Sequence, residues 1–437
     1  MTLARRMARF AAGPLAPSDL MRRFVGLSLF DWAAVGVAGA DEPVARAARA
    51  LALAEGAPPR ATLLGGGGAA PRAAALANGA ASHALDYDDT HFGHIGHPSV
   101  AVIPATLALA EARGATGAAL LDALAAGLEL ACRTGGWLGR PHYEAGFHQT
   151  GTSGAFGATA AAGRLVGLDE AAMTAALALA ATRAAGLKSQ FGTMGKPLNA
   201  GFAAETGVTC ALLAEAGMTS APEAFEGAQG FGPTHRGAAD AAAWDGLGTD
   251  WVFPGISYKF HACCHGLHAM LEAMRSLRAG MNDPAVVERV EIRTHPRWLA
   301  VCDQPAPETG LGAKFSFRLT AAMALAGVET AALDSYSAET CARPDLVALR
   351  DRVVVIPDPA LPDTASAVAV VAGGRRHEAR HDLRGAPDPD RDGRRLRAKA
   401  AALLGRERAG RLHAAVEGAG DAPDCRALAA EIGAEQP

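Results

Sequence analysis

Residues 16–40, APSDLMRRFVGLSLFDWAAVGVAGA, begin with a helix-cap signal at Ser18 and Asp19 and have a helix-ending glycine at Gly39. Between these signals the stretch is apolar on nearly every face, which is typical of a helix buried inside a bundle. Because Asp31 interrupts it, the stretch is too short and too polar to span a bilayer. It therefore predicts an internal helix of a large helical domain.

Apolar segments typical of buried helices follow one another to about residue 235. Each further predicted helix is closed by glycine or by a polar turn, and together they cover residues 44–56, 71–86, 99–114, 117–135, 151–167, 169–186 and 199–217. The abundant alanine and glycine would let the helix backbones approach closely. No repeat of fixed length is present, so a solenoid is not expected.

After about residue 265 the predicted secondary structure changes to a mixture of helices and strands. Helices are predicted over 265–280, 314–328 and 343–351, and strands over 285–296, 352–358, 365–374 and 375–385. The last two strands form a hairpin across Gly373 and Gly374. The predicted fold class is therefore mainly α. A large all-helical domain (residues 1–264 and 393–437) carries a smaller, lid-like α/β domain (residues 265–392) inserted before its C-terminal helices.

Composition narrows the functional class. The chain has 437 residues, half of them apolar, and a net charge of −4, which argues against a nucleic-acid binder. Its seven cysteines are thinly spread and do not form a disulfide framework. The N-terminal residues lack the long apolar core of a signal peptide. We expect a soluble cytoplasmic protein with no nucleic-acid or membrane partner.

The most polar stretch is ASHALDYDDTHFGHIGHPS, residues 81–99, which holds four histidines and three aspartates. If the preceding helix continues through it, Asp86 and Thr90 lie one turn apart on the same side. His97 precedes a proline and is biased toward extended backbone. The spacing matches no standard zinc or di-iron pattern, so we expect acid–base chemistry and no metal. A polar loop without chemistry remains the alternative.

Three further polar islands hold candidate residues. Tyr143 and His148 precede a glycine-, serine- and threonine-rich helix start, where free N–H groups favour a carboxylate or phosphate. Lys196 lies in a glycine- and proline-bounded turn and would supply a compact positive charge beside such a group. In HACCHGLH, residues 261–268, we expect buried, reduced cysteines and one functional histidine, His265.

Together these islands resemble the MmgE/PrpD family, which includes 2-methylcitrate dehydratase, cis-aconitate decarboxylase and iminodisuccinate epimerase. The resemblance covers roughly residues 17 to 275. It rests on ANGAASHALDYDDTH (77–91), GHPSVAVIPATLALAEARG (96–114), GFHQTGTSGAFGATAAAGRLVGLD (146–169), GLKSQFGTMGKPLNAGFAAETGV (186–208), EGAQGF (226–231) and HACCHGLH. The sequence is identified as a member of this family by the order and spacing of these motifs.

The resemblance implies a homodimer, an active site between a helical and a smaller domain, and no cofactor or metal. The matching site residues are Asp86, Thr90, His97, His148, Lys196 and His265, and Tyr143 fits the epimerase pattern. Three features of the sequence depart from the family. Leu319 stands where the decarboxylases have tyrosine, GKPLN replaces Thr-Lys-Pro-Leu-His, and His265 is often arginine in the dehydratases.

We therefore expect a lyase acting on a small di- or tricarboxylate through a carbanion next to a carboxylate, most closely a 2-methylcitrate dehydratase. Asp86 and His97 would move protons, either because burial raises the pKa of the aspartate or because a neighbouring carboxylate tunes that of the histidine. Thr90 would orient one of them, and Lys196 and His148 would bind the substrate and stabilise charge. Within the family the alternatives are an epimerase of an imino-linked dicarboxylate and a cis-aconitate decarboxylase. Outside it they are a metal-dependent hydrolase using residues 83–97 and a catalytically inactive binding protein.

Overall fold

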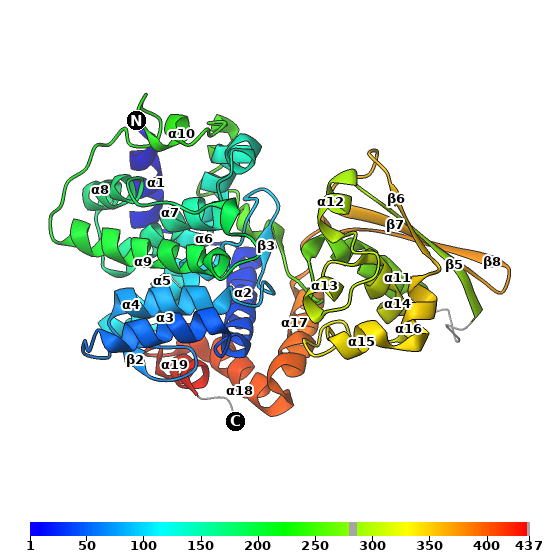
Figure 1. Ribbon diagram of the computed structural model, residues 1–437. Helices are drawn as coiled ribbons and strands as arrows, with labels where there is room; N and C mark the ends of the chain where they lie inside the picture. The colour runs from blue at the N-terminus through cyan, green and yellow to red at the C-terminus, as the bar shows by residue number, and fades with distance from the viewer. Residues whose placement is uncertain (279–285, 435–437) are drawn as a thin grey trace. The chain divides into compact units, whose positions relative to one another are not determined.

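The computed structural model describes residues 1–278 and 286–434, and the chain divides into two compact units. Unit 1 comprises Met1–Tyr258 and Pro387–Pro437, and unit 2 comprises Lys259–Ala386. Each boundary lies a few residues before the position expected from the sequence. The predicted fold class is confirmed, because the chain is mostly helical and carries a small mixed four-stranded sheet in its C-terminal region (Figure 1).

Unit 1 is built from helices and two minimal strand pairs. Its helices are α1 (Leu3–Ala12), α2 (Asp19–Ala38), α3 (Pro43–Ala54), α4 (Pro71–Ser82), α5 (Ser99–Arg113), α6 (Gly117–Glu144), α7 (Gln149–Leu165), α8 (Glu170–Ala180), α9 (Gly195–Glu215), α10 (Phe231–Thr234), α17 (Pro389–Leu404), α18 (Arg406–Glu417) and α19 (Arg426–Gly433). The strands β1 (Ala61–Thr62) and β2 (Gly68–Ala69) pair with each other, as do β3 (Thr90–His91) and β4 (Ile256–Ser257). Because two-residue strands have no period, they could not be predicted from the sequence.

The centre of unit 1 is formed by α5 and α7, which are buried along most of their lengths. Small residues let neighbouring helices touch here. A Cβ on Gly127 of α6 would lie 2.6 Å from the carbonyl oxygen of Gly157 on α7. One on Gly79 of α4 would lie 2.8 Å from the Cα of Gly201 on α9. The predicted close approach of the backbones is therefore confirmed at these two crossings.

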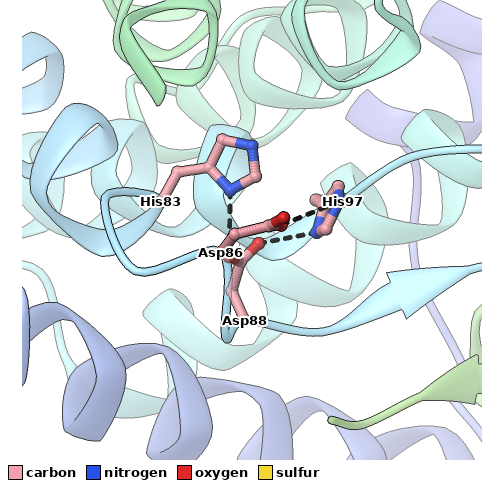
Figure 2. Close-up of side chains that lie close together, drawn as sticks. All are labelled: His83, Asp86, Asp88 and His97. Atoms are coloured by element: carbon pink, nitrogen blue, oxygen red, sulfur yellow. Dashed lines mark hydrogen bonds and ion pairs between the residues drawn. The ribbon is translucent and has the colours of Figure 1, made fainter. Parts of the chain in front are cut away.

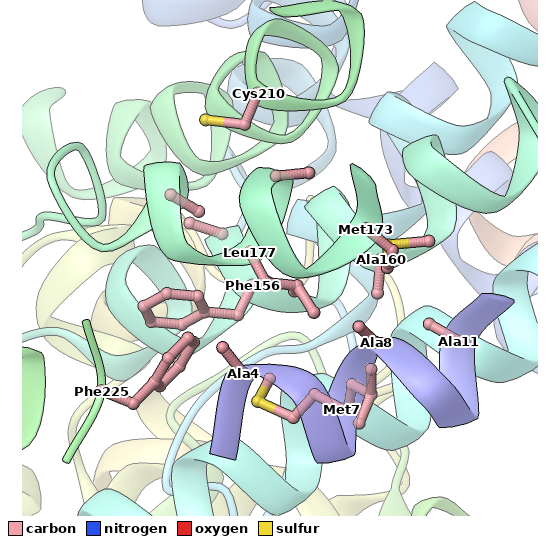
Figure 3. Packing of buried hydrophobic residues seen from close by; sticks show 14 of the residues in the cluster. Ala4, Met7, Ala8, Ala11, Phe156, Ala160, Met173, Leu177, Cys210 and Phe225 are labelled. Carbon is pink, nitrogen blue, oxygen red and sulfur yellow. The ribbon is translucent and has the colours of Figure 1, made fainter. Parts of the chain in front are cut away.

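Helix α1 was not predicted from the sequence. The Thr2 side chain caps it by accepting a hydrogen bond from the backbone N–H of Arg5. Its apolar residues Ala4, Met7, Ala8 and Ala11 follow helical spacing and pack into a cluster with residues of α7 and α8 (Figure 3). The cap residue and this spacing could have predicted α1 from the sequence. They were missed because arginines lie between the apolar residues.

Among the described residues, no single helix is long and apolar enough to cross a membrane. Helices α2 and α3 pass that test only when joined, and the chain bends by 92° between them. Most of α2 is buried within unit 1, where Ser18 caps it as predicted.

Unit 2 contains the four-stranded sheet and its helices. The strands β5 (Val287–Thr294), β6 (Val353–Pro357), β7 (Ala365–Ala372) and β8 (Arg375–Asp382) lie in the order β6-β5-β7-β8. Strands β5 and β6 are parallel, and the other two pairings are antiparallel. The helices are α11 (His268–Arg278), α12 (Leu299–Cys302), α13 (Gly310–Ala313), α14 (Phe317–Ala326), α15 (Ala338–Ala342) and α16 (Pro344–Arg350).

The predicted hairpin between β7 and β8 is confirmed. Gly373 and Gly374 both have positive φ, 56° and 72°, as a two-residue turn of this hand requires. Leu319, the departure noted in the sequence, is buried in α14. The end of the helix predicted over 265–280 and the start of the strand predicted over 285–296 fall on 279–285, outside the described residues.

Candidate active site

The loop between α4 and α5 carries most of the candidate residues. Helix α4 ends at Ser82, so the expected helical spacing of Asp86 and Thr90 is wrong. Asp86 adopts a φ of 50°, in the left-handed region, and turns the chain out of the helix. Thr90 begins β3, where its hydroxyl donates to the backbone carbonyl of Ser257 at 3.3 Å. The loop, and not a helix face, therefore arranges the site.

Asp88, which the sequence prediction left out, occupies the centre of this loop. Its Oδ1 lies 2.9 Å from Nδ1 of His83, and its Oδ2 lies 2.9 Å from Nδ1 of His97 (Figure 2). Burial acts to raise the pKa of Asp88, but the two histidines together outweigh burial and hold that pKa well below its usual range. An ionised carboxylate only accepts hydrogen bonds, so the His83 nitrogen carries the hydrogen.

Asp88 and His83 lie in the polar stretch that the sequence singled out, and that stretch was the only signal for them. Their pairing depends on the turn at Asp86, which no spacing rule foresees. Asp88 is also the buried aspartate of the site, whereas the side chain of Asp86 is 42% exposed. The burial expected of a proton-transferring aspartate is therefore found at Asp88, whereas Asp86 is not buried.

Asp86 pairs with Lys196. The ammonium Nζ lies 2.7 Å from Oδ1 of Asp86, and that oxygen is 3.7 Å from Nε2 of His97. The sequence suggested that Lys196 lies in a turn before the helix. In the structure it lies in the first turn of α9 itself. Because both side chains of the pair keep some exposure, a small anionic ligand can reach the ammonium without entering the core.

His148 joins this cluster from another helix. It is the N-cap of α7, it is buried, and its ring stacks on that of His83 with centroids 5.9 Å apart. Burial, helped by the neighbouring His83 and Lys196, holds the pKa of His148 well below its usual value. The Asn199 amide nitrogen lies 3.1 Å from its Nδ1 and donates to it. His148 is therefore a neutral imidazole whose hydrogen is on Nε2, so any charge stabilisation by it would come from hydrogen-bond donation and not from a positive charge.

The other two histidines of the loop hold the loop in place. The His91 Nδ1 accepts the backbone N–H of His94 at 3.0 Å, and the His91 Nε2 donates to the carbonyl of Val252. His94 is buried, and its Nε2 lies 2.8 Å from the Ser153 hydroxyl. Burial lowers the pKa of His94 to about 3, so it stays neutral. Neither imidazole is available for proton transfer to a ligand.

Tyr143 and His265 belong to elements other than the loop between α4 and α5. Tyr143 is on α6 beyond a break at Gly139, and the Lys188 ammonium sits 3.8 Å from its ring centroid. His265 begins a short 3-10 turn in unit 2, and its ring contacts that of His268. Their roles in a site remain predictions.

The loop also assembles a set of possible metal ligands. One ligand atom from each of His83, Asp86, Asp88 and His97 lies within 4.8 Å of the others. Nitrogen and carboxylate donors of this kind suit zinc. Sequence spacing did not foresee the set, because the turn at Asp86 folds distant positions together. The Lys196 ammonium already contacts Asp86, however, and its charge opposes a divalent ion at the same carboxylate.

Comparison with known proteins identifies the chain's relatives. Residues 5–242 match the MmgE/PrpD N-terminal domain, and residues 261–416 match the MmgE/PrpD C-terminal domain. The chain belongs to the MmgE/PrpD family. The C-terminal match extends beyond unit 2 into α17 and α18, which pack within unit 1. The candidate loop, His148 and Lys196 lie inside the N-terminal match.

Curated members of the MmgE/PrpD family that resemble the chain are named as decarboxylases. A cis-aconitate decarboxylase-like protein of Aspergillus oryzae is 29% identical over 233 residues, 49% of this chain and 48% of its own length. A cis-aconitate decarboxylase of Aspergillus terreus is 30% identical over 222 residues, 46% and 44% of the two chains. The human cis-aconitate decarboxylase is 29% identical over 210 residues, again 46% and 44%. The chain thus matches about half the length of these relatives.

Proposed function

We propose that the protein is a metal-independent lyase that acts on a small di- or tricarboxylate. The observation that carries this proposal is the Lys196–Asp86 pair beside His97, whose other ring nitrogen is held by the buried, ionised Asp88. The Lys196 ammonium is a fixed cation, and it lies near an imidazole that a carboxylate orients. This arrangement suits an anionic substrate that must exchange a proton at carbon. Membership of the MmgE/PrpD family supports the same substrate class.

Each residue of the cluster has a distinct part in this chemistry. Lys196 binds a substrate carboxylate and stabilises negative charge that spreads onto it from the neighbouring carbon. His97 moves the proton through Nε2, and Asp88 fixes its tautomer and stabilises its imidazolium form. The neutral His148 donates a hydrogen bond through Nε2. His83 holds Asp88 from the opposite side.

Dehydration of a 2-methylcitrate-like substrate is the first reaction we propose. A base takes the proton next to a carboxylate, and the β-hydroxyl group leaves as water after accepting a proton. Leu319 favours this choice, because it supplies no hydroxyl where the decarboxylases have tyrosine and is buried in unit 2.

Decarboxylation of cis-aconitate is the second candidate, and the names of the curated relatives support it. In that reaction the C–C bond electrons remain on carbon when carbon dioxide leaves, and the carbanion takes one proton. The same His97 and Lys196 would serve both reactions.

A panel assay in deuterated water tests the proposal. With 2-methylcitrate, cis-aconitate and iminodisuccinate as substrates, dehydration gives an unsaturated product, and decarboxylation gives carbon dioxide and one solvent deuterium in the product. Deuterium in recovered substrate without net conversion would instead indicate epimerisation. If none of these acids reacts or exchanges, the proposed activity is wrong.

A metal test separates this proposal from a hydrolase. The purified protein should hold less than a stoichiometric amount of zinc or iron and should keep its turnover in a strong chelator. Tightly bound metal that turnover requires would assign His83, Asp86, Asp88 and His97 to a metal site and contradict the metal-independent mechanism.

A further inference from the structure

Lys399 is a buried cation that reaches the candidate loop from the C-terminal part of the chain. It lies on α17, and its side chain is 1% exposed. The ammonium donates to Oδ1 of Asp31, on α2, at 2.6 Å and to the backbone carbonyl of Tyr87 at 2.7 Å. It also lies 4.1 Å from the centroid of the Tyr87 ring. Lys399 therefore joins α2, α17 and the loop between α4 and α5.

A lysine buried this deeply requires compensation. Burial acts to lower the pKa of Lys399, and the carboxylate of Asp31 is the main group that opposes this effect. A buried charge is tolerated only when it is paired and its hydrogens are bonded. The Tyr87 carbonyl supplies one of those bonds, so the loop is part of what keeps this lysine charged.

The position of the Tyr87 carbonyl matters because of its neighbours along the chain. The peptide group that contains it is planar and ends at the Cα of Asp88. Fixing the carbonyl oxygen therefore fixes the plane from which the Asp88 side chain departs toward His83 and His97. Asp86, on the other side of Tyr87, has the positive φ that directs the chain into this arrangement.

We propose that Lys399 is a positioning residue of the active site, which aligns Asp88 with His97 by holding the Tyr87 carbonyl. It touches neither the substrate nor the groups that exchange protons. The kinetic part of this inference rests on the proposed lyase activity, whereas the structural part does not.

The test uses the charge-balanced double variant Lys399→Met/Asp31→Asn. It removes the hydrogen bond to Tyr87 without leaving Asp31 as an unpaired buried charge. Lys399→Arg is the conservative variant, since it keeps a cation and donors. Arg164→Met is the matched control, because Arg164 also donates to two backbone carbonyls, those of Ala11 and Gly13. Arg164 and His148 lie at opposite ends of α7, about 24 Å apart at 1.5 Å per residue.

Two readouts decide the matter. In the double variant, kcat on the substrate found with the panel should fall at least tenfold while KM changes less than about twofold, because a misaligned proton-transfer group loses rate more than binding. Lys399→Arg should recover part of that loss, and Arg164→Met should keep the parental kcat. Backbone amide hydrogen exchange should accelerate in residues 83–91 of the double variant and stay parental there in Arg164→Met.

A folded double variant with parental kcat and parental exchange in residues 83–91 would overturn the inference. If the double variant does not fold, Lys399→Gln, which is shorter and neutral, is judged by the same two readouts. A parental protein that turns over no member of the panel contradicts the proposed function. In that case the exchange measurement still decides whether Lys399 holds the loop.

Discussion

Asp88 is the residue on which the proposed proton chemistry depends most. Replacing it by asparagine removes the anion between His83 and His97, so the imidazolium form of His97 loses its stabilising partner. We predict that Asp88→Asn lowers turnover by roughly a hundredfold or more, the scale of a proton-transfer group, and has a smaller effect on KM. His97→Gln should behave alike. Steady-state kinetics over a range of pH measure both effects.

The neighbouring Asp89 provides a matched control. It is equally buried, but its Oδ2 accepts from the Ser99 hydroxyl at 2.5 Å. Burial raises the pKa of Asp89 to about 7, so asparagine imitates its protonated form. Asp89→Asn should therefore keep turnover within a few-fold of the parent. Equal losses of turnover in Asp88→Asn and Asp89→Asn would show that the loop tolerates no substitution. They would contradict a specific role of Asp88 in proton transfer.

Lys196 combines binding with charge stabilisation. Lys196→Ala removes the ammonium from beside Asp86 and leaves the carboxylate to repel an anionic substrate. We predict that KM rises and kcat falls, because an interaction present in both the ground state and the transition state is lost. Arg183→Ala, which removes an exposed cation paired with Glu205, is the control. An effect on KM as large in Arg183→Ala as in Lys196→Ala would mean that general surface charge, and not Lys196, attracts the substrate.

At the scale of single elements, helix caps and apolar spacing were sufficient for most helices. Ser18 caps α2 as expected, and the glycine pair forms the β7–β8 turn. The failure lay where α4 ends, because a polar run after an alanine-rich helix can continue the helix or leave it. Only the tertiary contacts, β3 with β4 and Lys399 with Tyr87, decide between these outcomes. Asp86, His97, His148 and Lys196 could be proposed as candidates from the sequence, whereas Asp88 and His83 could be proposed only once that turn was known.

The contact between α6 and α7 predicts a sensitivity to acid. His142, on α6, is buried, with its Nδ1 2.6 Å from the carbonyl of His235 and its Nε2 2.9 Å from the hydroxyl of Thr152 on α7. Burial lowers the pKa of His142 to about 4, below the value of about 6.5 in an unfolded chain. The unfolded state therefore binds the proton more readily. The stabilisation is complete above pH 6.5 and is lost as pH falls toward 4.

We predict that His142→Gln flattens the pH dependence of the unfolding free energy between pH 6.5 and 4. The part removed should be up to about 3 kcal/mol, from 1.36 kcal/mol per unit of pKa shift. Denaturant unfolding at several pH values measures this slope. His413→Gln, at a histidine of α18 whose side chain is 21% exposed, controls for the loss of a histidine as such. An unchanged slope in His142→Gln would show that other groups cause the acid sensitivity.

At the scale of the whole molecule, we predict a homodimer formed through unit 1. Large apolar side chains are exposed on and just before α9: Leu187, Phe191, Met194 and Phe202. The surface of a monomeric protein rarely has so many in one segment. The Phe191 ring also packs edge-on against that of His148, with centroids 5.0 Å apart. A second copy covering this segment would therefore border the candidate site, so assembly and activity should be linked.

Sedimentation at micromolar concentration should show the dimer, and specific activity should fall on dilution as it dissociates. Phe202→Asp should shift the equilibrium toward monomer, because it places a charge among apolar side chains that the partner would desolvate. Leu51→Asp is the matched control, since Leu51 is equally apolar and exposed but lies on α3. A folded monomer in the parent would contradict the dimer. A monomer produced by Leu51→Asp and not by Phe202→Asp would move the interface from α9 to α3.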